Sequence, residues 1–228
     1  MNKYFAGRMK MADLIATNHN LILFMPRFGI ALGFGDKRVE EVCAESGISA
    51  DFVLLICNVC TFDDYLPELD EIVCTDLTRV VEFLKASHVY YLDKIPHIGE
   101  HLSSIASKLG DKYGTILKNF YSDYQTELTA HFRYEEDTVF PYLERLMAGA
   151  DDRMEQLAGL NDSHENIEET LGDLTQIVYK YLPGSLMPEE SIDVVFDILQ
   201  LSADFEKHYL IEEKIVMPYI QWLERRRG

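Results

Sequence analysis

Two histidine–glutamate pairs with the same spacing are the most informative feature of the sequence. His131 precedes Glu135 by four residues, and His208 precedes Glu212 by four residues. Four residues of α-helix turn through about 400° and rise about 6 Å, so in a helix the two side chains of each pair project from one face, one turn apart. Each pair can therefore offer one imidazole and one carboxylate to the same metal ion.

Two single histidines extend the pattern. His88 recurs 76 residues later as His164, each time directly after a serine, and the gaps from these histidines to the following pairs are 43 and 44 residues. A proline ten residues after the histidine of each pair, Pro141 or Pro218, is repeated as well. The chain is therefore expected to contain two similar helical hairpins, each with one single histidine and one histidine–glutamate pair.

Together these residues predict a metal centre for two ions. The predicted ligands are four imidazoles and two carboxylates that can bridge: His88, His131, Glu135, His164, His208 and Glu212. One histidine on an apolar face is more often a core residue that is hydrogen-bonded to a neighbour. Six such groups in one bundle core would each cost several kcal/mol unless a cation compensated them, and this favours the metal.

Other polar residues near these positions divide into two groups. Glu127 and Asp204 each stand four residues before a ligand histidine, so we expect them to support the ligands or accept protons. The alternative for both is a solvated carboxylate or one that pairs along its helix. His97 and His101 fall about 180° and 220° around the helix from His88, and we expect them on the surface.

The apolar residues around these groups predict the elements that position them. They recur every three or four residues, which indicates helices that bury one face, over residues 77–105, 117–146, 157–181 and 198–219. Connections are expected at Gly110–Gly114, Gly149–Asp152 and Leu182–Pro188. Short connections between long helices imply antiparallel neighbours. The predicted fold is therefore all-α, with an up-down-up-down four-helix bundle.

A small helical domain is expected before the bundle. The segment from Thr61 to Glu71 is acidic, contains Pro67 and lacks periodicity. We therefore predict an N-terminal domain, a linker and the bundle at residues 1–62, 63–75 and 76–228. Inside the N-terminal domain, helices are predicted over Met11–Phe24, over Val39–Glu45, and from a cap at Ser49 to Cys60.

Composition excludes several classes of function. With 39 acidic and 21 basic residues the net charge is −18, which repels phosphate backbones and anionic membranes, so we expect no nucleic-acid or membrane partner. The apolar stretches are too short to span a bilayer, no secretory signal pattern is present, and a cytoplasmic protein is expected. Cys57-Asn-Val-Cys60 has neither a second cysteine pair nor a βαβ context, so these are predicted to be structural core cysteines.

The ligand types indicate which metal would bind. Imidazoles mixed with bridging carboxylates suit iron, or manganese, better than structural zinc, which prefers closed cysteine-rich sites. The order His, His-x-x-x-Glu, His, His-x-x-x-Glu resembles that of hemerythrin-like HHE domains. Over nearly its full length the chain resembles the RIC (repair of iron centres) family. Its segment Phe-Gly-Ile-Ala-Leu-Gly-Phe-Gly-Asp, from Phe28, is similar to that family's Phe-Gly-Ile-Asp-Phe-Cys-Cys-Gly-Gly. Gly33 and Phe34 replace the family's adjacent cysteines, which puts a thiol-based role in question.

The resemblance implies a function for the centre. RIC-like proteins hold two non-haem iron ions, expected here to be bridged by an oxo group and carboxylates. They supply iron to damaged iron–sulfur proteins, or handle NO and O2, in nitrosative and oxidative stress. The expected partners are iron–sulfur client proteins and O2 or NO, and a homodimer is a further expectation. A metal-binding stress protein is favoured over a turnover enzyme. Two alternatives remain open: a diatomic-gas sensor that signals to a partner, and a metal-free interaction scaffold.

Overall fold

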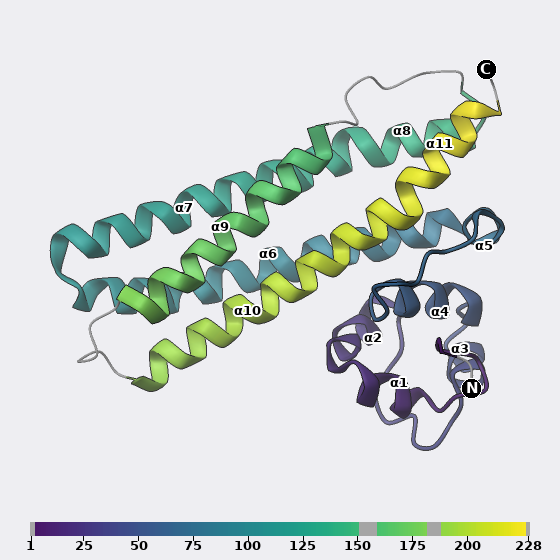
Figure 1. The fold of residues 1–228 in the computed structure, drawn as a ribbon, viewed down its shortest axis with the longest axis horizontal. Helices are drawn as coiled ribbons and strands as arrows, with labels where there is room; N and C mark the ends of the chain where they lie inside the picture. Colours follow the sequence, from purple (N-terminus) through teal and green to yellow (C-terminus); the bar gives the residue numbers. More distant parts are fainter. Residues whose placement is uncertain (1–2, 151–158, 182–187, 227–228) are drawn as a thin grey trace. The chain divides into compact units, whose positions relative to one another are not determined.

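The protein is all-α, as predicted. The computed structural model describes residues 3–150, 159–181 and 188–226 (Figure 1). Within these residues no strand forms, and the one β-type contact is an isolated bridge between Lys10 and Arg38. In the same residues, no helix combines the length and apolar character that crossing a membrane requires.

The N-terminal helices largely follow the predicted boundaries. They are α1 (Met11–Thr17), the 3₁₀ helix η1 (His19–Leu23), α2 (Phe24–Arg27), α3 (Val39–Glu45) and α4 (Ala50–Val59). The Ser49 hydroxyl accepts a hydrogen bond from the Phe52 backbone N–H at 3.4 Å, so it caps α4 as expected. The prediction of one helix over Met11–Phe24 was wrong. Asn18 breaks it, because its side chain accepts a bond from the Asn20 backbone N–H at 3.1 Å and so competes with the helical pattern.

The remaining helices cover the four predicted stripes, although the fourth begins at Pro188, ten residues before its predicted start. They are α5 (Leu69–Cys74), α6 (Leu77–Lys108), α7 (Gly110–Tyr134), η2 (Glu135–Val139), α8 (Phe140–Met147), α9 (Gly159–Tyr181), α10 (Pro188–Ile211), η3 (Glu212–Val216) and α11 (Met217–Arg225). Helix α5 occupies part of the segment that was predicted to be a linker. The chain forms two compact units. The first unit holds residues 1–87 and 207–228, and the second unit holds residues 88–206.

The first unit joins the N-terminal helices to the beginning of α6 and the end of the chain. Phe83 of α6 packs against Phe24 and Phe28, with ring centroids 5.2 and 4.8 Å away. The Lys214 ammonium donates to the backbone carbonyls of Asp63 and Tyr65 at 3.3 and 3.4 Å. The predicted domain boundary at residue 62 falls inside this unit and stays a prediction.

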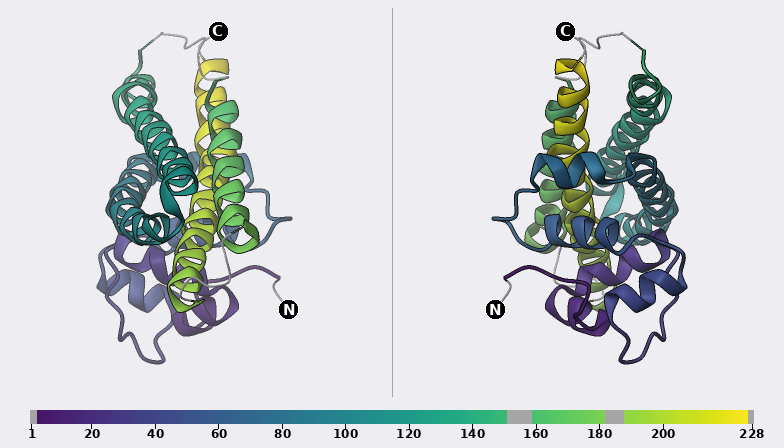
Figure 2. Two further views of the ribbon diagram at one scale, coloured as in Figure 1. Left: turned by 90° about the vertical axis from the view of Figure 1, so that its left-hand side faces the viewer. Right: turned by 90° about the vertical axis from the view of Figure 1, so that its right-hand side faces the viewer.

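The second unit is a four-helix bundle. Figure 1 shows that α6, α7, α9 and α10 reverse direction one after another, and Figures 1 and 2 show the green helix α9 beside the yellow-green helix α10. All four helices contribute to one buried apolar core, whose members include Tyr91, Ile98, Leu102, Tyr124, Leu128, Phe132, Leu171, Leu174, Ile198, Leu201 and Phe205. The up-down-up-down prediction is confirmed in this unit.

The connection between α6 and α7 is shorter than predicted. Gly110–Gly114 was expected to be a loop, but these residues form the first turn of α7, and only Leu109 separates the two helices. Gly110 supplies a backbone φ of +76°, and a Cβ on Gly114 would lie 2.3 Å from the carbonyl oxygen of Ala106. These glycines allow the tight reversal because they carry no side chain. In the other two predicted connections, residues 151–152 and 182–187 lie outside the described residues.

Candidate metal centre

Two of the predicted ligands, His88 and His131, converge on the buried carboxylate of a third, Glu135, in the second unit. The Glu135 side chain is fully buried. One of its oxygens, Oε2, lies 2.9 Å from Nε2 of His88 on α6, and the other, Oε1, lies 2.8 Å from Nε2 of His131, one turn earlier in the chain. Each oxygen of one carboxylate therefore faces a different imidazole. This is the arrangement that a carboxylate bridging two ions requires.

A second glutamate fixes the orientation of His88. The Nδ1 atom of His88 lies 2.7 Å from Oε1 of Glu136. A carboxylate can only accept a hydrogen bond, so the proton is on Nδ1, and in the neutral ring Nε2 presents a lone pair to Glu135. A ring lone pair and a carboxylate oxygen 2.9 Å apart in a dry environment repel each other unless a proton or a metal ion lies between them. The residues present therefore fit a bound metal, because a metal ligand histidine usually donates its other ring N–H to a carboxylate.

Glu136 was not among the predicted site residues. The signal that could have identified it is the Glu-Glu doublet that both motifs share, Glu135-Glu136 and Glu212-Glu213. Helical spacing alone places Glu136 about 100° away from Glu135, on the outer side of the helix. Its side chain is 44% exposed and still reaches the buried ring of His88.

Both predicted ligand glutamates, Glu135 and Glu212, begin a π-helical turn. The turn η2 runs from Glu135 to Val139 and η3 from Glu212 to Val216, and in each case the residue after the turn donates its N–H to the glutamate carbonyl five positions earlier. Pro141 and Pro218 stand two residues after the last residue of each turn. Proline has no N–H, and its ring would clash with the carbonyl four residues earlier in a regular α-helix. The repeated proline therefore explains why the helix widens at each glutamate, and such widening is frequent at functional sites.

Aromatic rings enclose the His88 imidazole. Phe132 stacks on it with ring centroids 4.2 Å apart and an interplanar angle of 15°, and Phe140 lies on it at 5.8 Å. Both phenylalanines are buried. These rings keep water away from His88 and hold its plane, and exclusion of water strengthens the electrostatic interactions of the site.

The second histidine–glutamate pair belongs to the first unit. Both His208 and Glu212 are buried, at 2% and 7% exposure, and Nε2 of His208 lies 3.4 Å from Oε1 of Glu212. The predicted one-turn pairing of imidazole and carboxylate is therefore present in this copy too. His164 lies on α9, but its side chain is outside the described residues.

Asp204 and Glu127, the two carboxylates that were predicted to support the ligands, differ in burial. Asp204 is fully buried, and its backbone carbonyl accepts a hydrogen bond from the Tyr91 hydroxyl at 3.0 Å. Glu127 is exposed. Exposure alone does not decide its role, so the position of Glu127 beside a ligand stays a prediction. The Asp204 assignment stays a prediction.

The prediction that His97 and His101 lie on the surface was right for one of the two. His97 is exposed, whereas His101 is half-buried. At 220° from His88, His101 adjoins the edge of the apolar face that Ile98 and Ile105 form, which accounts for its partial burial.

Buried tyrosines in the bundle core contribute no negative charge. Burial raises the pKa of both Tyr121 and Tyr124 far above the ordinary value. The Tyr121 hydroxyl donates to the backbone carbonyl of Ile95 at 2.5 Å. These hydroxyls stay protonated at neutral pH, so carboxylates are the anions available to a metal.

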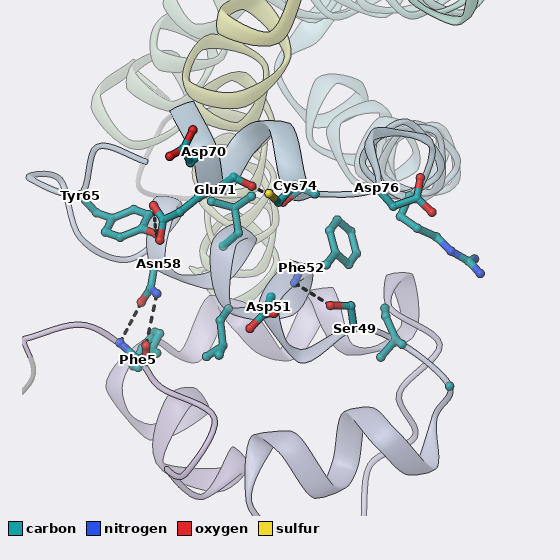
Figure 3. A pocket seen from close by; sticks show the side chains of 16 residues that line it. Phe5, Ser49, Asp51, Phe52, Asn58, Tyr65, Asp70, Glu71, Cys74 and Asp76 are labelled. Carbon is teal, nitrogen blue, oxygen red and sulfur yellow. Dashed lines mark hydrogen bonds between the residues drawn. The ribbon is translucent and has the colours of Figure 1, made fainter. Parts of the chain in front are cut away.

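A separate pocket of about 690 Å³ lies in the first unit. Figure 3 shows Asp51, Asp70, Glu71 and Asp76 around it. The Tyr65 hydroxyl donates to Glu71 at 3.2 Å, and burial followed by the charge of Glu71 raises the pKa of this tyrosine to about 12. The residues that line this pocket include no histidine, so it is not the predicted metal centre.

Comparison with family models identifies the bundle. The model of the hemerythrin HHE cation-binding domain matches residues 79–220, which is more than half of the chain. The chain belongs to this family. All six predicted ligands of the hemerythrin domain fall inside the match, and the histidine and glutamate clusters of the structure are able to hold a metal, which in this family is typically iron. A search of curated proteins finds no match to the chain.

Proposed function

We propose that the hemerythrin domain holds two iron ions through His88, His131, Glu135, His164, His208 and Glu212, and that the protein is a RIC-like stress protein. In this role it supplies iron for the repair of iron–sulfur clusters, and the same centre reacts with NO or O2. The observation that carries the proposal is the buried Glu135 carboxylate, whose two oxygens face two different imidazoles at 2.9 and 2.8 Å.

The residues of the chain have distinct tasks in this proposal. Glu135 and Glu212 supply the negative charge that offsets the metal ions, and the histidines supply neutral nitrogen ligands. Glu136 keeps the proton of His88 on Nδ1, so Nε2 is available as a ligand. Phe132 and Phe140 exclude water from this ring. Iron, when bound, would supply the redox chemistry and the open coordination positions that a diatomic ligand needs.

Two further features support iron supply. The net charge of −18 attracts cations toward the protein. Four histidines are also fewer than oxygen-carrying hemerythrins use, and a centre with fewer nitrogen ligands releases iron more readily. The segment from Phe28 is similar to the RIC N-terminal segment but lacks its cysteine pair, so the proposal assigns the iron chemistry to the bundle alone.

The test is transfer of iron to an apo iron–sulfur protein. Protein loaded with iron under anaerobic conditions should restore the cluster in the client faster than the same amount of free iron. Glu135→Ala, loaded in parallel, should fail to accelerate this step. A transfer rate no higher than that of free iron would refute the iron-supply role.

A gas sensor is the second candidate, and one observation favours it. Lys207, the residue before His208, has its backbone carbonyl 3.8 Å from the Cys60 sulfur at the end of α4. A movement of His208 would therefore shift the Lys207 carbonyl and change its contact with Cys60 at the end of α4 in the same unit. Reversible NO binding without loss of iron, followed in optical spectra, together with altered protection of residues 50–60 in hydrogen exchange, would favour sensing over iron supply.

A further inference from the structure

Two histidines and an aspartate form a second cluster in the bundle, apart from the predicted ligands. His97 and His101 lie one turn apart on α6, with ring centroids 4.5 Å from each other, and Asp197 lies on α10 of the same unit. One ligand atom from each of the three side chains can be chosen so that all lie within 4.8 Å of one another. His97 is exposed, and His101 and Asp197 are half-buried, so ions from solution can reach the cluster.

The hydrogen bonding of His101 is incomplete. Its Nδ1 is shielded from solvent and has no hydrogen-bond partner among the described residues. A polar atom withdrawn from water without a partner costs free energy, and a bound cation would remove this cost. The lone pair of a neutral imidazole is the group that binds such a cation.

We propose that His97, His101 and Asp197 bind one divalent first-row transition-metal ion, with zinc as the representative ion. Two histidines one helical turn apart present their nitrogens on one side of the helix, as in known zinc sites, and a carboxylate from a second helix gives a three-ligand set with a fourth position for water. Nitrogen and oxygen ligands about 2 Å from zinc lie about 3.4 Å from one another in a tetrahedron. Small side-chain rotations bring atoms within 4.8 Å to that separation.

This site is distinct from the hemerythrin centre. His97 follows His88 by nine residues, which corresponds to about 13 Å along an α-helix. It also differs in ligand type, since it has one half-buried aspartate in place of the buried bridging glutamate. A metal bound by His97, His101 and Asp197 would connect α6 to α10 and would bind only the folded chain, so it should stabilise the bundle.

The test is a zinc titration of the iron-loaded protein in competition with a chromophoric chelator. Wild type should take up one zinc ion per chain with no release of iron. His97→Ala, His101→Ala and Asp197→Asn should each weaken this binding about tenfold or more while the iron content and the helical circular dichroism stay unchanged. His19→Ala, in the N-terminal helices, is the matched control and should bind zinc as wild type does.

A thermal melt gives a second readout. Zinc at about one hundred times its dissociation constant should raise the Tm of wild type by about 5–10 °C, and it should not raise the Tm of His101→Ala. Equal zinc affinity in wild type, His97→Ala and His101→Ala would overturn the proposal. Release of one iron ion for each zinc bound would also overturn it, because zinc would then be entering the hemerythrin centre. The difference between wild type and His101→Ala does not depend on iron loading, so a failure of the proposed function leaves this test intact.

Discussion

Removal of the Glu136 carboxylate should weaken iron binding although Glu136 is not itself a predicted ligand. Its oxygen lies 2.7 Å from Nδ1 of His88, whose side chain is fully buried. Loss of such a partner of a metal ligand typically weakens metal affinity by about 10–100-fold, or about 1.4–2.8 kcal/mol. In the metal-free protein, Glu136→Ala leaves a buried N–H without its acceptor, at a cost of about 1–3 kcal/mol.

The assay is iron retention during dialysis against chelators of graded strength, with Tm measured in parallel. Glu136→Gln should lose less than Glu136→Ala, because the amide oxygen still accepts from Nδ1. Glu213→Ala is the matched control, since Glu213 is the second residue of the other Glu-Glu doublet and is exposed. If Glu136→Ala retained iron as wild type does, the contact would be an ordinary surface ion pair worth about 0–1 kcal/mol, and our explanation of the His88 orientation would be wrong.

Three further predictions concern packing, the helix reversal and the cysteines. Phe132→Ala should lower the free energy of unfolding by about 3–5 kcal/mol and the Tm by about 10 °C or more, measured by thermal melt, because a buried ring is lost from the face of the His88 imidazole. Gly114→Ala should destabilise the protein because its Cβ would lie 2.3 Å from a backbone oxygen, whereas Gly172→Ala meets nothing within 4 Å and should be neutral or stabilising by up to about 1 kcal/mol. Of the four thiols, only the exposed Cys74 should react rapidly with a disulfide reagent in the native state. Burial raises the pKa of Cys43 from 9.0 to about 11, so its contribution to stability is complete below about pH 9 and should be lost as pH rises to about 11.

Apolar periodicity was enough to predict the bundle, because each long helix must bury one stripe and the stripe can be read from spacing alone. It failed where a single residue decides the local structure. Asn18 ends α1 through its own side-chain bond, and Gly110 and Gly114 allow a reversal of one residue where a five-residue loop was expected. Such local effects depend on the position of the neighbouring chain, which periodicity does not contain.

At the site, spacing predicted which side chains would meet but not how they would be oriented. His131 and Glu135 meet as a one-turn step requires, and His88 joins them from another helix. Glu136 was missed because it reaches the site from an exposed position with a flexible side chain. The π turns were missed although their cause, the proline ten residues after the histidine, was visible in both copies.

We propose that this hemerythrin domain binds two iron ions around the Glu135 carboxylate. The most direct measurement is the iron content of anaerobically reconstituted protein after removal of loosely bound metal, with Mössbauer spectra of the same samples. We expect about two iron ions per chain in wild type, in a spectrum of coupled high-spin iron, and far less iron in Glu135→Ala, with no loss of helical content. A wild-type chain that retains no iron, or a Glu135→Ala chain that retains two ions with an unchanged spectrum, would show that Glu135 does not hold a di-iron centre.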